Sequence, residues 1–132
     1  MTIEKFQSFQ VRLYSKDGET SPVEEYLTDL LDSNKEFGLE AIAEISKLPE
    51  IMYLGFGKKI KPFKQGGFKC LELRIKHKNN ICRFFFITEE PNYIVLCGFT
   101  KKTDKTDKKD ILKGENSLQD YLNNKKSISF DY

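Results

Sequence analysis

The chain has little of several residue types that carry enzyme chemistry. It contains no tryptophan, one histidine and three cysteines among 132 residues. The cysteines stand singly in apolar segments without a CxxC pair, which favours buried reduced thiols over a disulfide framework or a metal site. The sequence also lacks a Ser/His/Asp or Cys/His set, a paired acidic site and a phosphate-binding glycine loop. We therefore expect no cofactor, and any catalysis has to come from lysine and arginine.

Long apolar segments are absent as well. No apolar run approaches the roughly 20 residues that a membrane-spanning helix needs. The first residues, Met1 to Phe6, do not show the basic stretch and apolar run of a secretion signal. A length of 132 residues fits one domain with a real core. These features predict a single cytoplasmic domain over residues 1–132, with no membrane partner.

The net charge of +2 conceals an uneven distribution of charge along the chain. Residues 1–54 carry 5 basic and 11 acidic side chains, whereas residues 55–109 carry 14 basic and 5 acidic ones. A basic sheet beside acidic helices creates a field that attracts a polyanion, and nucleic acid is the commonest one. A solvated lysine-rich surface is the alternative, and charge alone does not separate the two.

The first half of the chain predicts a strand followed by two helices. Alternating residues indicate a strand at 9–14, and Ser21-Pro22 offers an N-cap and a first-turn proline for the first helix. The second helix is predicted at 37–48, ending before Pro49, with Leu39, Ile42, Ile45 and Leu48 on one face. An irregular connection at 50–68 has room for a short edge strand.

The second half predicts three strands at 70–76, 81–88 and 93–100, joined as an antiparallel meander. A last helix follows at 108–122, with a kink near Gly114, and residues 123–132 are expected to form a flexible tail. The fold class is α+β, with a small antiparallel-rich sheet and the helices on one face.

Strand alternation sets the direction of the basic residues. Leu71, Leu73 and Ile75 share the core face, so Arg74 points away from it. An even-numbered hairpin loop after residue 76 puts Arg83 on the same face as Arg74, with its head group toward a ligand. The same register places Gly98 beside Arg83 and leaves room for that ligand.

The ends of the strands gather four cations at one corner: Lys76, Arg83, Lys101 and Lys102. The other end of this face is apolar and needs a cover, either the C-terminal helix or a partner protein. That patch consists of Phe85, Ile87, Ile94 and Leu96.

Each of these residues also has a purely structural interpretation. Arg74 could pair with Glu72 along the sheet, and His77 is expected to lie exposed in a hairpin loop. Lysines at 101, 102 and 105 could form a solvated loop. Their convergence on one corner favours a functional site.

The residues that carry these features also carry a family resemblance. Five segments occur in a characteristic order: Ser21 to Leu27, Lys61-Pro62-Phe63-Lys64, Leu71-Glu72-Leu73-Arg74, Ile81 to Phe86, and Gly98 to Thr106. Over about residues 9–122 the chain resembles the phage-derived Gp49-like, HigB-type branch of the RelE/ParE toxin superfamily. The resemblance implies a RelE-like fold.

The resemblance also implies a toxin of a toxin–antitoxin pair that cleaves mRNA in the ribosomal A site. Its partner is expected to be a small helix-turn-helix antitoxin of the HigA type. In such ribonucleases the RNA 2′-hydroxyl attacks the adjacent phosphate, and lysines and arginines stabilise charge and move protons.

Roles follow by position within the resemblance. Arg74 and Arg83 are expected to bind the phosphate and its transition state, and Lys101 or Lys102 to transfer a proton. The expected RNA-binding residues are Lys61, Lys64, Lys76 and Lys105. Asp107 departs from the proline common at that place in the family, and Tyr121 and Tyr132 are open candidates for a catalytic tyrosine.

Two rival functions share this fold. A ParE-like protein inhibits gyrase by protein contact, and a domesticated phage protein keeps the fold as a binding module without cleavage. The two arginines on strands favour the ribonuclease over both.

Overall fold

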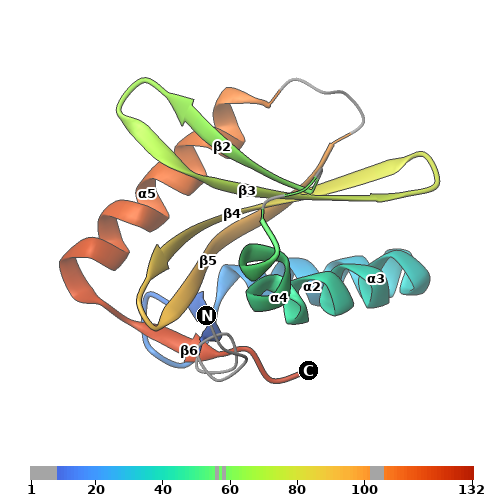
Figure 1. Ribbon diagram of the computed structural model, residues 1–132, viewed down its shortest axis with the longest axis horizontal. Helices are drawn as coiled ribbons and strands as arrows, with labels where there is room; N and C mark the ends of the chain where they lie inside the picture. The colour runs from blue at the N-terminus through green and yellow to red at the C-terminus, as the bar shows by residue number, and fades with distance from the viewer. Residues whose placement is uncertain (1–8, 56, 58, 102–105) are drawn as a thin grey trace.

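The computed structural model describes residues 9–55, 57, 59–101 and 106–132. This part of the chain forms an α+β fold of six strands and four helices (Figure 1). In chain order the elements are β1 (Gln10–Tyr14), α2 (Pro22–Ser33), α3 (Lys35–Ser46), α4 (Leu48–Tyr53), β2 (Ile60–Gln65), β3 (Phe68–His77), β4 (Asn80–Glu89), β5 (Asn92–Lys101), α5 (Lys108–Asn124) and β6 (Ser127–Ser129).

The strands form one mixed sheet in the order β2-β3-β4-β5-β1-β6. Strands β2 to β5 pair antiparallel in sequence order, which confirms the predicted meander and the short edge strand before it. Strand β1 runs parallel to β5 and pairs with it only over Asn92–Val95. The second half of β5 therefore extends beyond β1, towards the start of α5.

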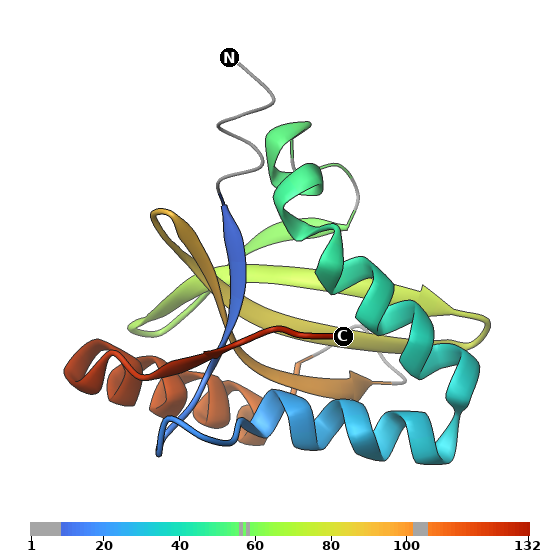
Figure 2. The same ribbon diagram turned by 90° about the horizontal axis from the view of Figure 1, so that it is seen from below.

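The helices cover both faces of the sheet, so the prediction that they lie on one face is wrong (Figures 1 and 2). Helices α2, α3 and α4 pack on one face, and α5 packs on the other. Three consecutive phenylalanines of β4, Phe84 to Phe86, are each 0% exposed. Because side chains alternate along a strand, such a run supplies apolar surface to both faces.

Side chains that cap the first turns account for where α2 and α3 begin. The Ser21 hydroxyl accepts a hydrogen bond from the Val23 amide at 3.1 Å, and Pro22 occupies the first turn, where no N–H is needed. Helix α3 begins before the predicted residue 37 because the Asn34 side chain accepts from the Phe37 amide at 3.2 Å. Capping thus fixes both starts.

The predicted face of the second helix is partly wrong. Leu39 is 51% exposed, because steps of three residues drift around a helix of 3.6 residues per turn. The buried stripe is instead formed by Phe37, Ala41 and Ile45. Pro49 also does not end helical structure, since it lies in the first turn of the short helix α4.

The C-terminal part is more regular than predicted. Helix α5 runs from Lys108 to Asn124 as one element, and residues 127–129 pair with β1 as β6 where a flexible tail was expected. Arg12 stabilises this pairing, since its Nε donates to the Ser127 hydroxyl at 2.7 Å. Within the described residues, none of the helices is long and apolar enough to span a membrane.

Candidate phosphate-binding site on the sheet

Two arginines lie directly opposite each other on neighbouring strands. Arg74 of β3 pairs with Arg83 of β4, so both side chains leave the sheet on the same face, as the sequence predicted. The register adds three lysines to this face, because Lys61 lies opposite Glu72, and Lys76 and Lys101 both lie opposite Ile81. We call these five cations the basic corner: Lys61, Arg74, Lys76, Arg83 and Lys101.

Arg83 is the most buried of the five cations of the basic corner. Its side chain is 4% exposed, whereas the sequence placed its head group toward a ligand. The guanidinium Nη1 donates to the Thr106 hydroxyl at 2.9 Å and lies 3.7 Å from the Glu72 carboxylate. Thr106 lies shortly before α5 in the chain. Arg83 therefore connects β4 to β3 and to the start of α5.

Lys101 is held by the first turn of α5. Its ammonium group lies 3.0 Å from the Asp107 carboxylate and 3.2 Å from that of Asp110. The hydrogen bond to Asp107 raises the pKa of Lys101 above its ordinary value, and Asp110 adds to this effect. The same contact lowers the pKa of Asp107. At neutral pH Lys101 is therefore a fixed positive charge.

The remaining predicted cations differ in accessibility. Arg74 is half-buried, while Lys61 and Lys76 are exposed. Lys64 is also exposed but lies opposite Lys69, near the turn between β2 and β3, on the other face from Lys61. The sheet therefore does not bring Lys64 to the basic corner. Lys102 and Lys105 lie outside the described residues.

The prediction that Gly98 lies beside Arg83 is wrong. The pairing of β4 with β5 shifts between Phe85 and Phe86, where Leu96 is the extra residue on β5. Arg83 therefore faces Phe99, and Gly98 faces the α2 side of the sheet. A Cβ at Gly98 would lie 2.4 Å from Cε1 of Phe84, so this position holds a phenylalanine ring and leaves no room for a ligand.

The apolar patch predicted beside the corner is covered by the protein's own α5. Phe85, Ile94 and Leu96 are each 0% exposed, and they pack in one cluster with Ile111 and Tyr121 of α5. Ile87 packs against the same cluster. Of the two covers that the sequence left open, the C-terminal helix is the one present.

His77 does not lie in an exposed loop. It ends β3 with a side chain that is 17% exposed, stacked on Phe37 with ring centroids 5.7 Å apart. Its Nδ1 lies 3.1 Å from the Glu40 carboxylate, and its Nε2 lies 3.6 Å from that of Glu36. His77 thus connects β3 to α3, on the face opposite the basic corner.

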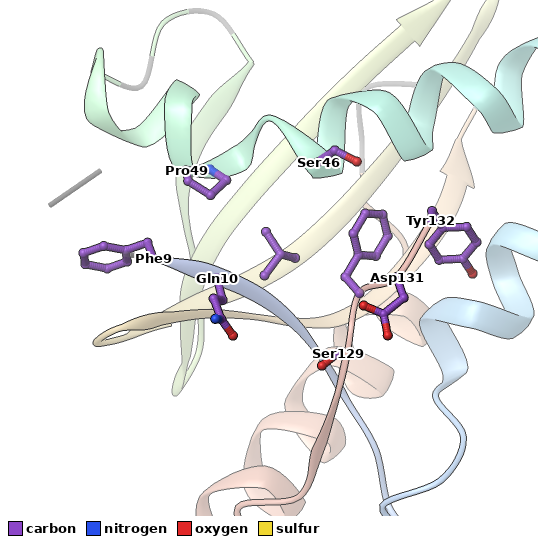
Figure 3. Close-up of a pocket in the computed structure, with 9 residues that line it drawn as sticks. Phe9, Gln10, Ser46, Pro49, Ser129, Asp131 and Tyr132 are labelled. Carbon is purple, nitrogen blue, oxygen red and sulfur yellow. The ribbon is translucent and has the colours of Figure 1, made fainter. Parts of the chain in front are cut away.

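The two tyrosine candidates lie away from the basic corner. The Tyr121 hydroxyl donates to Glu89 at 2.7 Å, at the far end of β4. Six residues of a strand separate Glu89 from Arg83, which is about 20 Å. Tyr132 lies beside Asp131 in a pocket of about 430 Å³ between the C-terminal residues and α4, with Phe9 at its other end (Figure 3). Among the described residues, no cationic side chain lines that pocket.

The cysteines match the expectation of buried thiols, since Cys70, Cys82 and Cys97 are all free and buried. Burial raises the pKa of Cys82 and of Cys97 to about 12, so neither is a nucleophile at neutral pH. Among the described residues, no three His, Cys, Asp or Glu side chains are grouped to hold a metal ion.

Sequence reasoning missed the polar residues that hold the cations. Alternation places Glu72 on the arginine face, and a pair of Glu72 with Arg74 was one structural interpretation. The contact of Glu72 with Arg83 at 3.7 Å was not predicted, nor were the contacts of Thr106, Asp107 and Asp110 with the cations. The contacts of Thr106 and the two aspartates depend on how α5 returns to the sheet, for which the sequence has no local signal.

The arrangement suits the binding of a phosphate. Arginine binds phosphate oxygens in a bidentate way, and opposed arginines over a buried sheet give a positive field little screened by water.

Neither the curated proteins nor the solved structures give a significant match to this chain. The family model of the phage-derived Gp49-like proteins (DUF891) matches residues 25–119, which include all of β2 to β5. The chain thus belongs to the Gp49-like family, which is associated with RelE/HigB-type toxins.

Proposed function

We propose that this protein is the toxin of a type II toxin–antitoxin pair, a ribosome-dependent endoribonuclease that cleaves mRNA in the A site. The reaction is attack of an RNA 2′-hydroxyl on the adjacent phosphate. The observation that carries the proposal is the opposed pair of Arg74 and Arg83 within the basic corner. Family membership supports it. Since translating ribosomes are cytoplasmic, the proposal assigns the protein to the cytoplasm.

The architecture is in keeping with this proposal. A meander with two N-terminal helices on one face and a C-terminal helix on the other is the arrangement we propose to be RelE-like. Helix α5 begins near the end of β5, so its N-terminal end lies beside the basic corner (Figure 1). An RNA strand would approach the sheet at that end.

The five cations divide into two groups by exposure. Lys61, Lys76 and the half-buried Arg74 are the groups that we propose to contact the RNA backbone. The side chain of Arg83 is 4% exposed, so we propose that it lies below the bound phosphate and acts as a preorganised positive charge. A charge fixed in a region of low dielectric stabilises a phosphorane without reorganising in the transition state.

Lys101 is proposed to supply charge and to protonate the leaving 5′ oxygen. The carboxylates of Asp107 and Asp110 raise its pKa, so it is protonated at neutral pH and cannot act there as a general base. The described residues of the basic corner contain no histidine. We therefore propose that the ribosome positions the substrate in line for attack, which accounts for ribosome dependence.

The experiment that tests this function is expression of the chain followed by two measurements on the same cells. Mapping of RNA 5′ ends should show new ends within translated mRNA, while plasmid supercoiling stays normal. Intact mRNA with altered supercoiling would identify a gyrase inhibitor instead. If expression changes neither measurement nor growth, the chain is a binding module without toxicity.

The proposed partner is a small helix-turn-helix antitoxin of the HigA type that covers the basic corner. Because α5 already buries the apolar patch, an acidic segment of the antitoxin would gain mainly from the charge of the corner. Hydrogen exchange with and without antitoxin tests this. Protection confined to residues 21–48, with none at 81–101, would show that the antitoxin binds the acidic helices instead.

A further inference from the structure

Arg74 and Arg83 form a like-charge pair that needs a counter-charge. Residues directly opposite on antiparallel strands have Cβ atoms about 4.5–5.5 Å apart, and like charges at such positions destabilise a sheet. Glu72 precedes Arg74 by two residues on β3 and lies on the same face, diagonally across from Arg83. Its carboxylate Oε2 lies 3.7 Å from Nη1 of Arg83. Glu72 therefore contributes one negative charge beside two positive ones.

Both members of this ion pair are buried. The side chain of Arg83 is 4% exposed and that of Glu72 is 10% exposed. A buried ion pair costs desolvation energy, and replacement by apolar residues of similar size is often neutral or stabilising. Stability alone therefore does not account for a carboxylate at this place. A fixed direction for the arginine head group does account for it.

We propose that Glu72 is a positioning residue for the proposed ribonuclease reaction: with Thr106, it fixes the Arg83 guanidinium beneath the scissile phosphate. The inference rests on the proposed function. Thr106 accepts a hydrogen bond from Nη1 at 2.9 Å, and the Glu72 carboxylate lies 3.7 Å from the same nitrogen. The two partners come from different parts of the chain, β3 and the segment before α5, so both restrict where the guanidinium lies.

The negative charge of Glu72 also affects how tightly Arg74 and Arg83 bind an RNA phosphate. The negative charge of Glu72 weakens the attraction of the two guanidinium groups for an RNA phosphate. Removal of the carboxylate charge would strengthen ground-state binding while it releases Arg83 from its position. A positioning role thus predicts a lower kcat together with an unchanged or lower KM, which loss of structure does not produce.

The test is Glu72→Gln, with Glu44→Gln as the matched control. The side chain of Glu44 is similarly buried, 11% exposed, and also binds a cation, Lys59 at 2.6 Å, but on the α3 side of the sheet. Cleavage of mRNA on purified translating ribosomes is measured for both. For Glu72→Gln we expect kcat to fall by about 10²-fold with KM unchanged or lower, because small displacements of a catalytic group have effects of this size. For Glu44→Gln we expect the wild-type kcat.

Two further measurements keep the test decisive. Glu72→Asp retains the charge on a shorter side chain, so its kcat should lie between those of wild type and Glu72→Gln, and it replaces Glu72→Gln if that variant does not fold. The Nε–Hε resonance of Arg83 in ¹⁵N NMR should be sharp in wild type and broadened in Glu72→Gln. This readout needs no cleavage activity, so it tests the positioning even if the wild-type protein cleaves no mRNA.

The outcomes separate the two proposals. An inactive wild-type protein with a broadened Arg83 resonance in the variant would refute the ribonuclease function but not the positioning. An unchanged resonance, or a kcat for Glu72→Gln equal to that of Glu44→Gln, would overturn the role proposed for Glu72. A fall in kcat that merely follows a loss of folded protein would also overturn it.

Discussion

The ammonium group of Lys101 lies between two carboxylates of α5, 3.0 Å from Asp107 and 3.2 Å from Asp110. Because Asp107 follows the segment that connects β5 to α5, these contacts link the end of the sheet to the helix that covers it. The link also raises the pKa of Lys101 above its ordinary value.

The first prediction concerns the pH dependence of cleavage. Since the pKa of Lys101 is raised from 10.5, the side chain stays protonated throughout the neutral range and titrates only at more alkaline pH. Lys101→Arg should therefore retain the wild-type shape of the profile of kcat between pH 6 and pH 9, at a reduced level because arginine is a poorer proton donor. If the wild-type kcat changes with pH between pH 6 and pH 9 and this change is absent in Lys101→Arg, Lys101 acts as a base.

The second prediction concerns Arg83. Arg83→Ala should lower the cleavage rate by about 10²–10³-fold, the typical effect of losing one transition-state charge contact. It should also lower the free energy of unfolding by about 3–5 kcal/mol, because Glu72 is left as a buried charge without its cation. Arg83→Lys should retain most of the stability but little of the activity, since lysine cannot reproduce the contacts of the planar guanidinium with Thr106 and Glu72.

A double variant separates these two effects of Arg83. In Glu72→Gln/Arg83→Met neither buried charge remains, so urea unfolding should show more stability than in Arg83→Ala. Cleavage should stay as low as in Arg83→Ala. If the double variant regains activity together with stability, Arg83 has a structural role only.

The third prediction concerns the contact between α5 and the sheet. A Cβ at Gly114 would lie 2.7 Å from Cδ2 of Phe85 and 2.9 Å from Cζ of Phe68, two rings that are 0% and 1% exposed. Overpacking of this kind costs about 1–3 kcal/mol, while alanine gains about 1 kcal/mol in helix propensity. Gly114→Ala should therefore lower the free energy of unfolding in urea, because both rings are enclosed.

Gly67→Ala is the control for this prediction. Gly67 lies in the turn between β2 and β3, and an added Cβ there meets nothing within 4 Å. Its free energy of unfolding should match that of wild type. Equal stability of Gly114→Ala and Gly67→Ala would mean that α5 shifts away from the sheet at no cost.

The opposed arginines could be predicted from the sequence because their geometry is local. Strand alternation and a short hairpin loop determine that Arg74 and Arg83 share a face, and β3 and β4 have that register. The position of Gly98 could not be predicted in the same way. The extra residue Leu96 reverses the faces of the strand beyond it, and nothing in an alternating apolar segment marks where such a bulge occurs.

Contacts distant in sequence account for the other differences. The parallel pairing of β1 with β5 joins residues 82 positions apart, and the antiparallel pairing of β6 with β1 joins residues up to 117 positions apart. The contact of Arg83 with Thr106, 23 residues away, depends on the return of α5 to the sheet. Patterns of hydrophobicity predict which face of an element is buried but not which element buries it.

The last prediction concerns alkaline pH and the far end of α5. Burial raises the pKa of Tyr121 from 10.0 to about 12, and the hydrogen bond that its hydroxyl donates to Glu89 adds to this effect. Between pH 10 and pH 12 the unfolded chain therefore loses this proton while the folded protein keeps it. The unfolded state then binds fewer protons, so the free energy of unfolding falls as pH rises through this range.

Tyr121→Phe removes the titrating group and should reduce this fall. Urea unfolding at a series of pH values should show that wild type loses stability more steeply above pH 10 than the variant does. Below pH 9 the variant should be less stable than wild type by about 0.5–1.5 kcal/mol, the usual net contribution of a hydrogen bond. Identical slopes for wild type and Tyr121→Phe would show that Tyr121 does not contribute to the alkaline transition, and that other groups account for it.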